Sequence, residues 1–288
     1  MIKVIMAKSP VKDYRMIVDS GTSKYVNRVM IGTATEGDIR MEWAGARYGM
    51  TIPTNWSMVN VVQFLNPYMP KRYSVADAQN LIVQHAIEKE FEWLWLLEDD
   101  TIPPPDAIVK FNKYIRDETH PVVSGLYFTR SVPSDPMIYR GRGTSYYTKW
   151  KLGDKVYADG VPTGMLLIHM GLLREMYKDA PEYATYGGRT TRRIFRNPME
   201  QWFDEEKGEF GQLSGTTDLQ WCTDVIEGNY FKKSGWDKFA KMKYPFLVDT
   251  SISCMHIDTT GEQFPAGGIV QWCADNGNLK YESKESKK

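Results

Sequence analysis

One segment constrains the fold more than any other: residues 91–97 read FEWLWLL and run directly into Glu98, Asp99 and Asp100. A continuous apolar and aromatic run of this length is typical of a strand that is buried on both faces, as in a parallel sheet covered by helices. The prolines at 103–105 then mark a turn. The segment therefore predicts a central strand with three carboxylates at its carboxyl end.

The segments on either side of this strand alternate in type. We expect strands in three further apolar runs, over residues 28–35, 57–65 and 122–128. Helices are expected between the strands, over residues 38–48, 75–87 and 106–114. Ser74 followed by Asp77 is a capping-box pattern at the start of the second of these helices. The alternation predicts an α/β fold with a Rossmann-like, mostly parallel central sheet flanked by helices, in which ligands bind at the carboxyl ends of the strands.

The second half of the chain has shorter elements and predicts a smaller, mixed-sheet part of the same domain. Residues 161–170 and 245–258 are expected to form strands, and residues 172–177 and 216–227 to form helices. Residues 186–214 have no clear period, which indicates either a functional loop or disorder. The polar end of the chain, KYESKESKK, is expected to fray.

Composition limits the class of protein. Lys plus Arg and Asp plus Glu both total 36, so the balance disfavours non-specific binding to nucleic acid without excluding it. The three cysteines form no CxxC pair, and neither a signal peptide nor an apolar run long enough for a membrane span is evident. We therefore expect a cytoplasmic protein.

The acidic triplet is the main functional signal. Three adjacent carboxylates at the end of a buried strand repel one another, so a folded site needs a cation or strong hydrogen-bond donors there. Such hard oxygen ligands suit Mg²⁺ or Mn²⁺, with a diphosphate completing the shell. The simpler alternative is that the acids only favour the N-terminus of the following helix.

Four segments, taken in order, resemble the GT-A-fold glycosyltransferases, especially the large inverting family related to cellulose and chitin synthases. WLWLLEDDTIPPPDAIVKF resembles the family's strand, Asp-x-Asp motif and following helix, and VPTGMLLIHMGLL resembles its acceptor-side strand. GTTDLQWCTDVIEGNY resembles the helix that carries the catalytic base, and VDTSISCMHI the strand that ends in a metal-binding histidine. The resemblance spans residues 28–258. It departs from the family at Glu98, the first acidic position, and at Thr217, where the family often has Glu.

The resemblance implies a role for each motif residue. Asp100 and His256 would hold Mn²⁺ or Mg²⁺ against the donor's two phosphates, and Asp218 would act as the catalytic base. The donor-binding residues would be Thr33, Thr35, Glu36, Asn80, Glu98 and Asp99, and the acceptor-binding residues Thr163 and Gly164. An Arg-rich loop, residues 189–196, could close over the phosphates as a lid.

Simpler roles compete with three of these assignments. Asp218 could merely favour its helix dipole, His256 could be a core histidine, and Asn80 could be a polar helix residue that faces solvent.

The resemblance also implies a division of the chain: an N-terminal extension (1–27), a nucleotide-sugar-binding half (28–130), an acceptor-binding and catalytic half (131–260) and a C-terminal tail (261–288). The implied partners are a UDP- or GDP-sugar and a glycan, lipid-linked or other hydroxyl acceptor, and we expect inversion, with retention as the alternative outcome.

Other classes of function stay open. A nucleotidyltransferase would also pair acids with a metal, but residues 33–40 lack the Gly-rich, Lys-containing loop of that class. A non-catalytic glycan-binding protein is the third candidate. A virus-encoded enzyme that glycosylates modified DNA bases would be a specialised form of the first.

Overall fold

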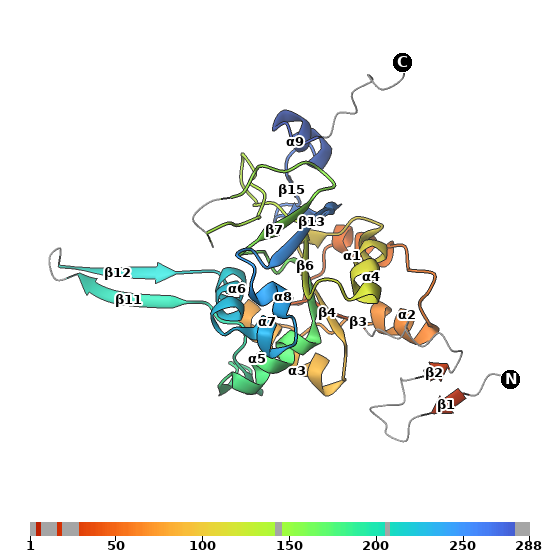
Figure 1. Cartoon of the computed structure of the whole chain (residues 1–288). Helices are drawn as coiled ribbons and strands as arrows, with labels where there is room; N and C mark the ends of the chain where they lie inside the picture. The colour runs from red at the N-terminus through yellow and green to blue at the C-terminus, as the bar shows by residue number, and fades with distance from the viewer. Residues whose placement is uncertain (1–3, 7–15, 19–28, 142–145, 205–207, 280–288) are drawn as a thin grey trace, which may run out of the picture.

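The computed structural model describes residues 4–6, 16–18, 29–141, 146–204 and 208–279, and a six-stranded mixed sheet forms its centre (Figure 1). In spatial order the strands are β3 (Val29–Gly32), β4 (Trp93–Leu97), β8 (Met165–His169), β6 (Val122–Leu126), β13 (Phe246–Ser253) and β7 (Lys155–Ala158). The pairs β3–β4 and β6–β13 are parallel, whereas β8 and β7 run antiparallel to their neighbours. Four strands therefore point the same way, which confirms the predicted α/β class and is consistent with the GT-A type.

Strand β4 is buried on both faces, as its sequence predicts. Leu94 and Leu96 belong to one apolar cluster, and Trp93, Trp95 and Leu97 to a second cluster on the opposite face. Successive side chains of a strand point to opposite faces, so each cluster receives every second residue. The predicted parallel neighbour is present on one side only, because β4 pairs parallel with β3 and antiparallel with β8.

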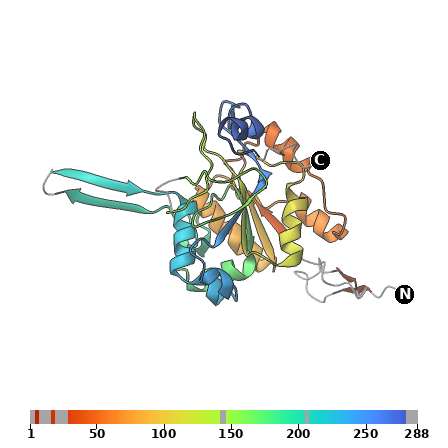
Figure 2. The same cartoon turned by 45° about the horizontal axis from the view of Figure 1, so that its top comes forward.

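Helices cover both faces of the sheet (Figure 2). The first cluster takes in residues of α3 (Val75–Glu88), α5 (Met170–Asp179), α6 (Thr217–Glu227), α7 (Tyr230–Lys233) and α8 (Asp237–Ala240). The second takes in residues of α1 (Met41–Tyr48), α2 (Met58–Leu65) and α4 (Ala107–Asp117). No helix in the described ranges is long and apolar enough to cross a bilayer.

The strand predicted over residues 57–65 is wrong, because this segment forms helix α2. The hydroxyl of Ser57 caps the helix by accepting a hydrogen bond from the Asn60 N–H at 3.3 Å. Phe64 is buried, whereas Val62 and Leu65 are exposed. Because apolar residues lie on both sides of this helix, the sequence shows no clear helical period. Ser57, a residue type that favours the N-cap position, was the feature that indicated a helix.

Residues 186–214 form strands where the sequence predicted a loop or disorder. Strand β10 (Thr190–Arg192) pairs with β9 (Glu182–Ala184), and β11 (Met199–Asp204) pairs in register with β12 (Glu209–Ser214). Figures 1 and 2 both show the β11–β12 hairpin standing away from the sheet. Both pairs are antiparallel and join residues that are close in sequence. Their short strands mix polar and apolar residues and lack the strong apolar period that identifies core strands.

The end of the described chain is part of the fold. Strand β14 (Met255–Ile257) pairs with both β15 (Gln263–Phe264) and β5 (Thr101–Ile102) in a three-stranded sheet. In helix α9 (Ile269–Asp275), Cys273 is buried and Trp272 stacks on Trp150 with ring centroids 5.9 Å apart. The tail assigned to residues 261–288 is therefore folded as far as residue 279, and residues 280–288 lie outside the described residues.

Of the N-terminal extension assigned to residues 1–27, the structure describes one antiparallel pair, β1 (Val4–Met6) with β2 (Met16–Val18).

Candidate active site

A cleft of about 830 Å³ lies where strands β3 and β4 end. The residues that follow β3 form one side of it and the acidic triplet that follows β4 forms the other, as expected for ligand binding at carboxyl strand ends. The lining residues are Ala34, Thr35, Glu36, Asp38, Ile39, Arg40, Tyr73, Ser74, Val75, Glu98, Asp99, Asp100, Arg130 and Thr259.

Hydrogen bonds to the backbone of Glu98 fix the start of the acidic turn. The Glu98 N–H donates to the Gly164 carbonyl at 3.1 Å, and its carbonyl accepts from the Thr101 N–H at 3.2 Å. The Trp43 indole N–H donates to the same carbonyl at 2.8 Å. The carboxylates therefore project from a backbone that strand β8 and helix α1 both hold.

The pairing of β5 with β14 brings His256 to the acidic triplet. His256 is the register partner of Thr101, and the Ile257 N–H donates to the Asp100 carbonyl at 2.8 Å. As a result the His256 Nε2 lies 3.1 Å from the Asp100 Oδ2, although 156 residues separate them in sequence. The structure thus joins the two residues that the sequence predicted as metal ligands.

The other ring nitrogen determines the state of this histidine. The His256 Nδ1 lies 2.9 Å from the Phe128 carbonyl oxygen, which can only accept, so Nδ1 carries a proton. In the neutral ring the Nε2 lone pair would then face a carboxylate oxygen, and two acceptors at this distance repel each other. The contact requires either a proton between the two groups or a shared cation, and a carbonyl partner on the far nitrogen is typical of metal-binding histidines.

Tyr127 contacts both members of this pair. Its ring lies 4.5 Å from the His256 ring, and its hydroxyl donates to the Asp100 Oδ1 at 3.4 Å and accepts from the Thr101 hydroxyl at 3.0 Å. A Cβ on Gly164 would lie 2.7 Å from the ring carbon that bears this hydroxyl. Gly164, predicted as an acceptor-binding residue, therefore makes room for the tyrosine.

The three carboxyl groups have different proton affinities. Burial, together with the charges of Asp100 and Asp218, raises the pKa of Glu98 to about 8, although Thr163 donates a hydrogen bond to it at 3.0 Å. Burial also raises the pKa of Asp99, against an opposing hydrogen bond from Thr35. Burial acts in the same direction on Asp100, but the hydrogen bond and charge of His256, with Arg130, outweigh it and lower its pKa. Asp100 is therefore the group best held as an anion.

Asp218 stands in the first turn of α6, where its negative charge helps to raise the pKa of Glu98. Burial raises the pKa of Asp218 itself, while the hydroxyl of Thr216 opposes the shift. Its Oδ1 accepts from the Leu219 N–H at 2.8 Å. A carboxyl group whose proton affinity is raised in this way suits a general base.

The donor set fits one hard divalent cation. In the described ranges no three His, Cys, Asp or Glu side chains form a ligand cluster, and Asp100 with His256 offers two ligands. Mg²⁺ and Mn²⁺ commonly use one or two protein ligands and take the rest from water and substrate phosphates. Burial and the neighbouring acidic charges together raise the pKa of Glu98, and a divalent cation next to these acids would stabilise their charged forms.

The other predicted site residues fall into two groups. Thr35 and Glu36 line the cleft, and Thr163 reaches it through its bond to Glu98. Thr33 is fully buried and is absent from the lining residues. Asn80, predicted as a donor-binding residue, is also fully buried, and its amide makes four hydrogen bonds, to Tyr183, Ile194 and Phe195. The prediction that Asn80 faces a donor, and the alternative that it faces solvent, both disagree with this placement.

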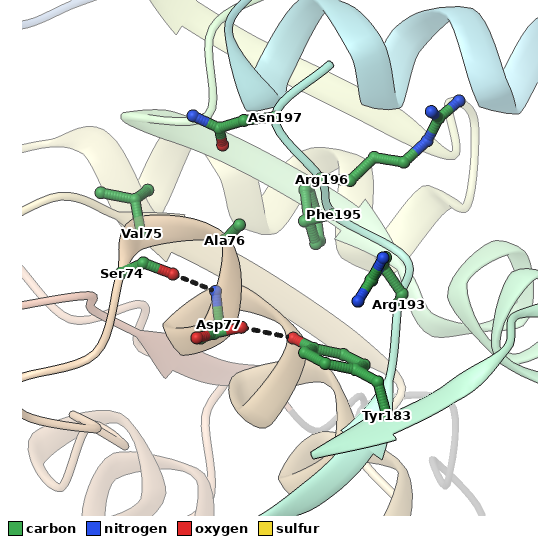
Figure 3. Close-up of a pocket in the computed structure, with 9 residues that line it drawn as sticks. All are labelled: Ser74, Val75, Ala76, Asp77, Tyr183, Arg193, Phe195, Arg196 and Asn197. Carbon is green, nitrogen blue, oxygen red and sulfur yellow. Dashed lines mark hydrogen bonds between the residues drawn. The ribbon is translucent and has the colours of Figure 1, made fainter. Parts of the chain in front are cut away.

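A second cavity, of about 340 Å³, adjoins the cleft and shares Ser74 and Val75 with it (Figure 3). Arg193 lines it, with its guanidinium 4.6 Å from the Tyr183 ring centroid, and Arg196 pairs with Asp224 at 2.9 Å. The Arg-rich segment 189–196, predicted as a lid, thus includes strand β10 and is anchored to the fold.

Sequence analysis missed three residues of the site: Arg40, Tyr127 and Arg130. The Arg40 Nη1 donates to the Asp99 carbonyl at 3.4 Å, and the Arg130 Nη1 donates to the Asp100 Oδ2 at 3.1 Å. Tyr127 lies near the end of the strand predicted over residues 122–128, and Arg130 follows that strand by two residues. The rule that points to Glu98, polar residues at the carboxyl end of a strand, could have found Arg130.

Comparisons with known proteins assign neither a family nor a function to this chain. No protein-family model and no curated protein matches the sequence. The structure of A197 from STIV is similar over 80% of this chain and 86% of that chain, with a TM-score of 0.48 and 14% identity. Two structures of S. aureus TarS 1-349, one of them in complex with UDP-GlcNAc, have TM-scores of 0.34 and 0.35 at 10% and 9% identity. Both cover 54% of this chain, and 48% and 50% of TarS 1-349, so the match spans about half of that protein fragment.

Proposed function

We propose that this protein is a metal-dependent glycosyltransferase that transfers a sugar from a UDP- or GDP-sugar to an acceptor hydroxyl, with inversion at the anomeric carbon. The observation that carries the proposal is the 3.1 Å contact between the His256 Nε2 and the Asp100 Oδ2, with Nδ1 bound to a backbone carbonyl. This is an arrangement that a shared cation would stabilise. The cleft beside it, of about 830 Å³, is large enough for a nucleotide.

In this proposal, side chains of the cleft and the adjoining His256 have separate roles. Thr35 and Glu36 would contact the nucleoside, and Asp100 and His256 would hold Mn²⁺ or Mg²⁺. Mn²⁺ or Mg²⁺, when bound, would stabilise the negative charge that develops on the leaving nucleoside diphosphate. Glu98 and Asp99 offer further acceptors for the ribose or for water.

Asp218 performs the proton transfer. Its carboxylate takes the proton of the acceptor hydroxyl as the acceptor oxygen bonds to the anomeric carbon, while the bond from that carbon to the phosphate oxygen breaks. The pKa of Asp218, which burial raises, makes its carboxylate a stronger proton acceptor. Attack from the side opposite the leaving phosphate inverts the anomeric configuration.

Thermal stabilisation and turnover test the proposal together. We expect Mn²⁺ with UDP or GDP to raise the melting temperature, and a panel of UDP- and GDP-sugars to yield a donor whose transfer or hydrolysis stops in EDTA. The Asp100→Asn variant should lose the response to Mn²⁺. Asp106→Asn is the matched control, because Asp106 pairs with Lys110 at 2.9 Å and does not line the cleft.

Failure has a clear form. If no donor turns over and no divalent cation shifts the melting temperature, the proposed function is wrong. Release of pyrophosphate from a nucleoside triphosphate would instead favour a nucleotidyltransferase.

A further inference from the structure

Arg130 forms an ion pair with the Asp100 Oδ2, the oxygen atom that the proposed cation would bind. Its Nη1 lies 3.1 Å from the Asp100 Oδ2, and the His256 Nε2 lies at the same distance from the same oxygen. A divalent cation between Asp100 and His256 would bind this oxygen through a lone pair. The cation and the guanidinium therefore compete for one site.

Hydrogen bonds hold the backbone around Arg130, whereas its side chain is partly exposed. The Thr129 N–H donates to the Asp135 carbonyl at 3.0 Å, and the Asp135 N–H donates to the Thr129 hydroxyl at 2.9 Å. The Ser134 hydroxyl closes the same turn on the Ser131 carbonyl at 2.7 Å. By contrast, the Arg130 side chain is 44% exposed and lines the cleft. It can leave Asp100 without disturbing the turn.

We propose that Arg130 is a place-holding cation, which neutralises Asp100 in the resting protein and moves to the donor's diphosphate when a divalent cation takes its place. The inference rests on the proposed function and adds a residue that the sequence did not indicate. A guanidinium matches phosphate oxygens in a planar, two-pronged geometry, and the cleft places such oxygens next to Asp100. One charge thus serves two partners in succession.

This exchange predicts effects of opposite sign from one substitution. In Arg130→Ala no guanidinium competes for the Asp100 oxygen, so Mn²⁺ alone should bind about two- to fivefold more tightly, the range that a partly exposed ion pair contributes. The same variant lacks a charged bond to phosphate, so UDP in the presence of saturating Mn²⁺ should bind about ten- to a hundredfold more weakly. A residue with only a structural role would not move the two affinities in opposite directions.

Arg40→Ala is the matched control. It removes an equal charge from the same cleft, but Arg40 donates to the Asp99 carbonyl and not to the Asp100 carboxylate. If the effect of Arg130 is direct competition, Arg40→Ala should tighten Mn²⁺ binding by less than Arg130→Ala does.

The experiment uses the full chain, with Mn²⁺ affinity measured by electron paramagnetic resonance and UDP affinity by calorimetry. Tighter Mn²⁺ and weaker UDP binding in Arg130→Ala, with circular dichroism unchanged, supports the exchange. Unchanged or weaker Mn²⁺ binding in this variant, or an equal gain in Arg40→Ala, overturns it and leaves the proposed function standing. If the parent protein binds neither Mn²⁺ nor nucleotide, the proposed function itself is overturned, and the exchange with it.

Discussion

Replacement of Asn80 by alanine separates the predicted donor-binding role of this residue from the scaffold role that the structure indicates. The Asn80 Nδ2 donates to the Tyr183 hydroxyl and the Phe195 carbonyl, both at 2.9 Å. Its Oδ1 accepts from the N–H groups of Ile194 and Phe195 at 2.9 and 2.8 Å. One amide therefore ties helix α3 to the segment that follows β10.

The loss of stability in Asn80→Ala follows from the backbone N–H groups that the substitution leaves without an acceptor. Ile194 and Phe195 are buried, so their N–H groups would lose a partner where water does not easily replace it. An unsatisfied buried donor costs about 1–3 kcal/mol, and two of them give a loss of about 2–6 kcal/mol in the free energy of unfolding. That is a large part of the 5–15 kcal/mol that is typical of a folded domain.

Urea unfolding followed by tryptophan fluorescence measures this loss, and hydrogen exchange of the Ile194 and Phe195 amides locates it. We expect both amides to lose protection in Asn80→Ala. The control is Asn66→Ala, whose side chain makes one exposed hydrogen bond to the Val62 carbonyl. It should cost less than about 1.5 kcal/mol.

The reasoning is refuted if Asn80→Ala unfolds within about 1 kcal/mol of the parent, keeps both amides protected and yet loses affinity for nucleotide. That result would place Asn80 at the donor after all.

Two further predictions concern catalysis and pH. Asp218→Asn should lower kcat about 10²- to 10⁴-fold, the usual contribution of a general base, and leave the donor KM nearly unchanged. It should also raise the melting temperature, because it removes a carboxyl group whose pKa burial raises; full activity in a kinetic assay would rule out the base role. Burial, and secondarily the charge of Arg174, lower the pKa of His169 to about 4, so the native state disfavours its proton and stability should fall as pH drops from about 6.5 to 4. This residue lowers the free energy of unfolding by about 3 kcal/mol at most. The variant His169→Asn keeps an acceptor for the Gly171 N–H, and it should make the free energy of unfolding in urea less dependent on pH in this range. An unchanged slope would contradict the assignment.

The parts of the fold that could be predicted are those with a strong local period or a cap. Strand β4 and helix α3 lie within one or two residues of their predicted bounds, because a buried apolar run and the Ser74 cap are properties of adjacent residues. Helix α2 was missed because apolar residues cover more than its buried side. The antiparallel strand β8 was expected as a strand, but its direction depends on its neighbours and not on its own sequence.

The candidate site divides in the same way. Glu98 and its neighbours follow a recognisable strand, so their place in the cleft could be inferred from the sequence. Asn80 could not be placed, since the partners of its amide lie 103 to 115 residues away in a segment without a clear period. Arg130 is exposed and pairs across 30 residues, a contact that depends on how β6 lies relative to the acidic turn.

Because a chain is synthesised from its N-terminus, the pairing of β5 with β14 can form only late in synthesis. A ribosome would deliver all three acids well before the imidazole, because β14 is among the last strands of the described chain. Any fragment that stops before residue 255 would carry the carboxylates without His256. A ligand that needs both the carboxylates and His256 would therefore bind the chain that includes β14 and not the shortened fragment. Its binding free energy would stabilise only the former.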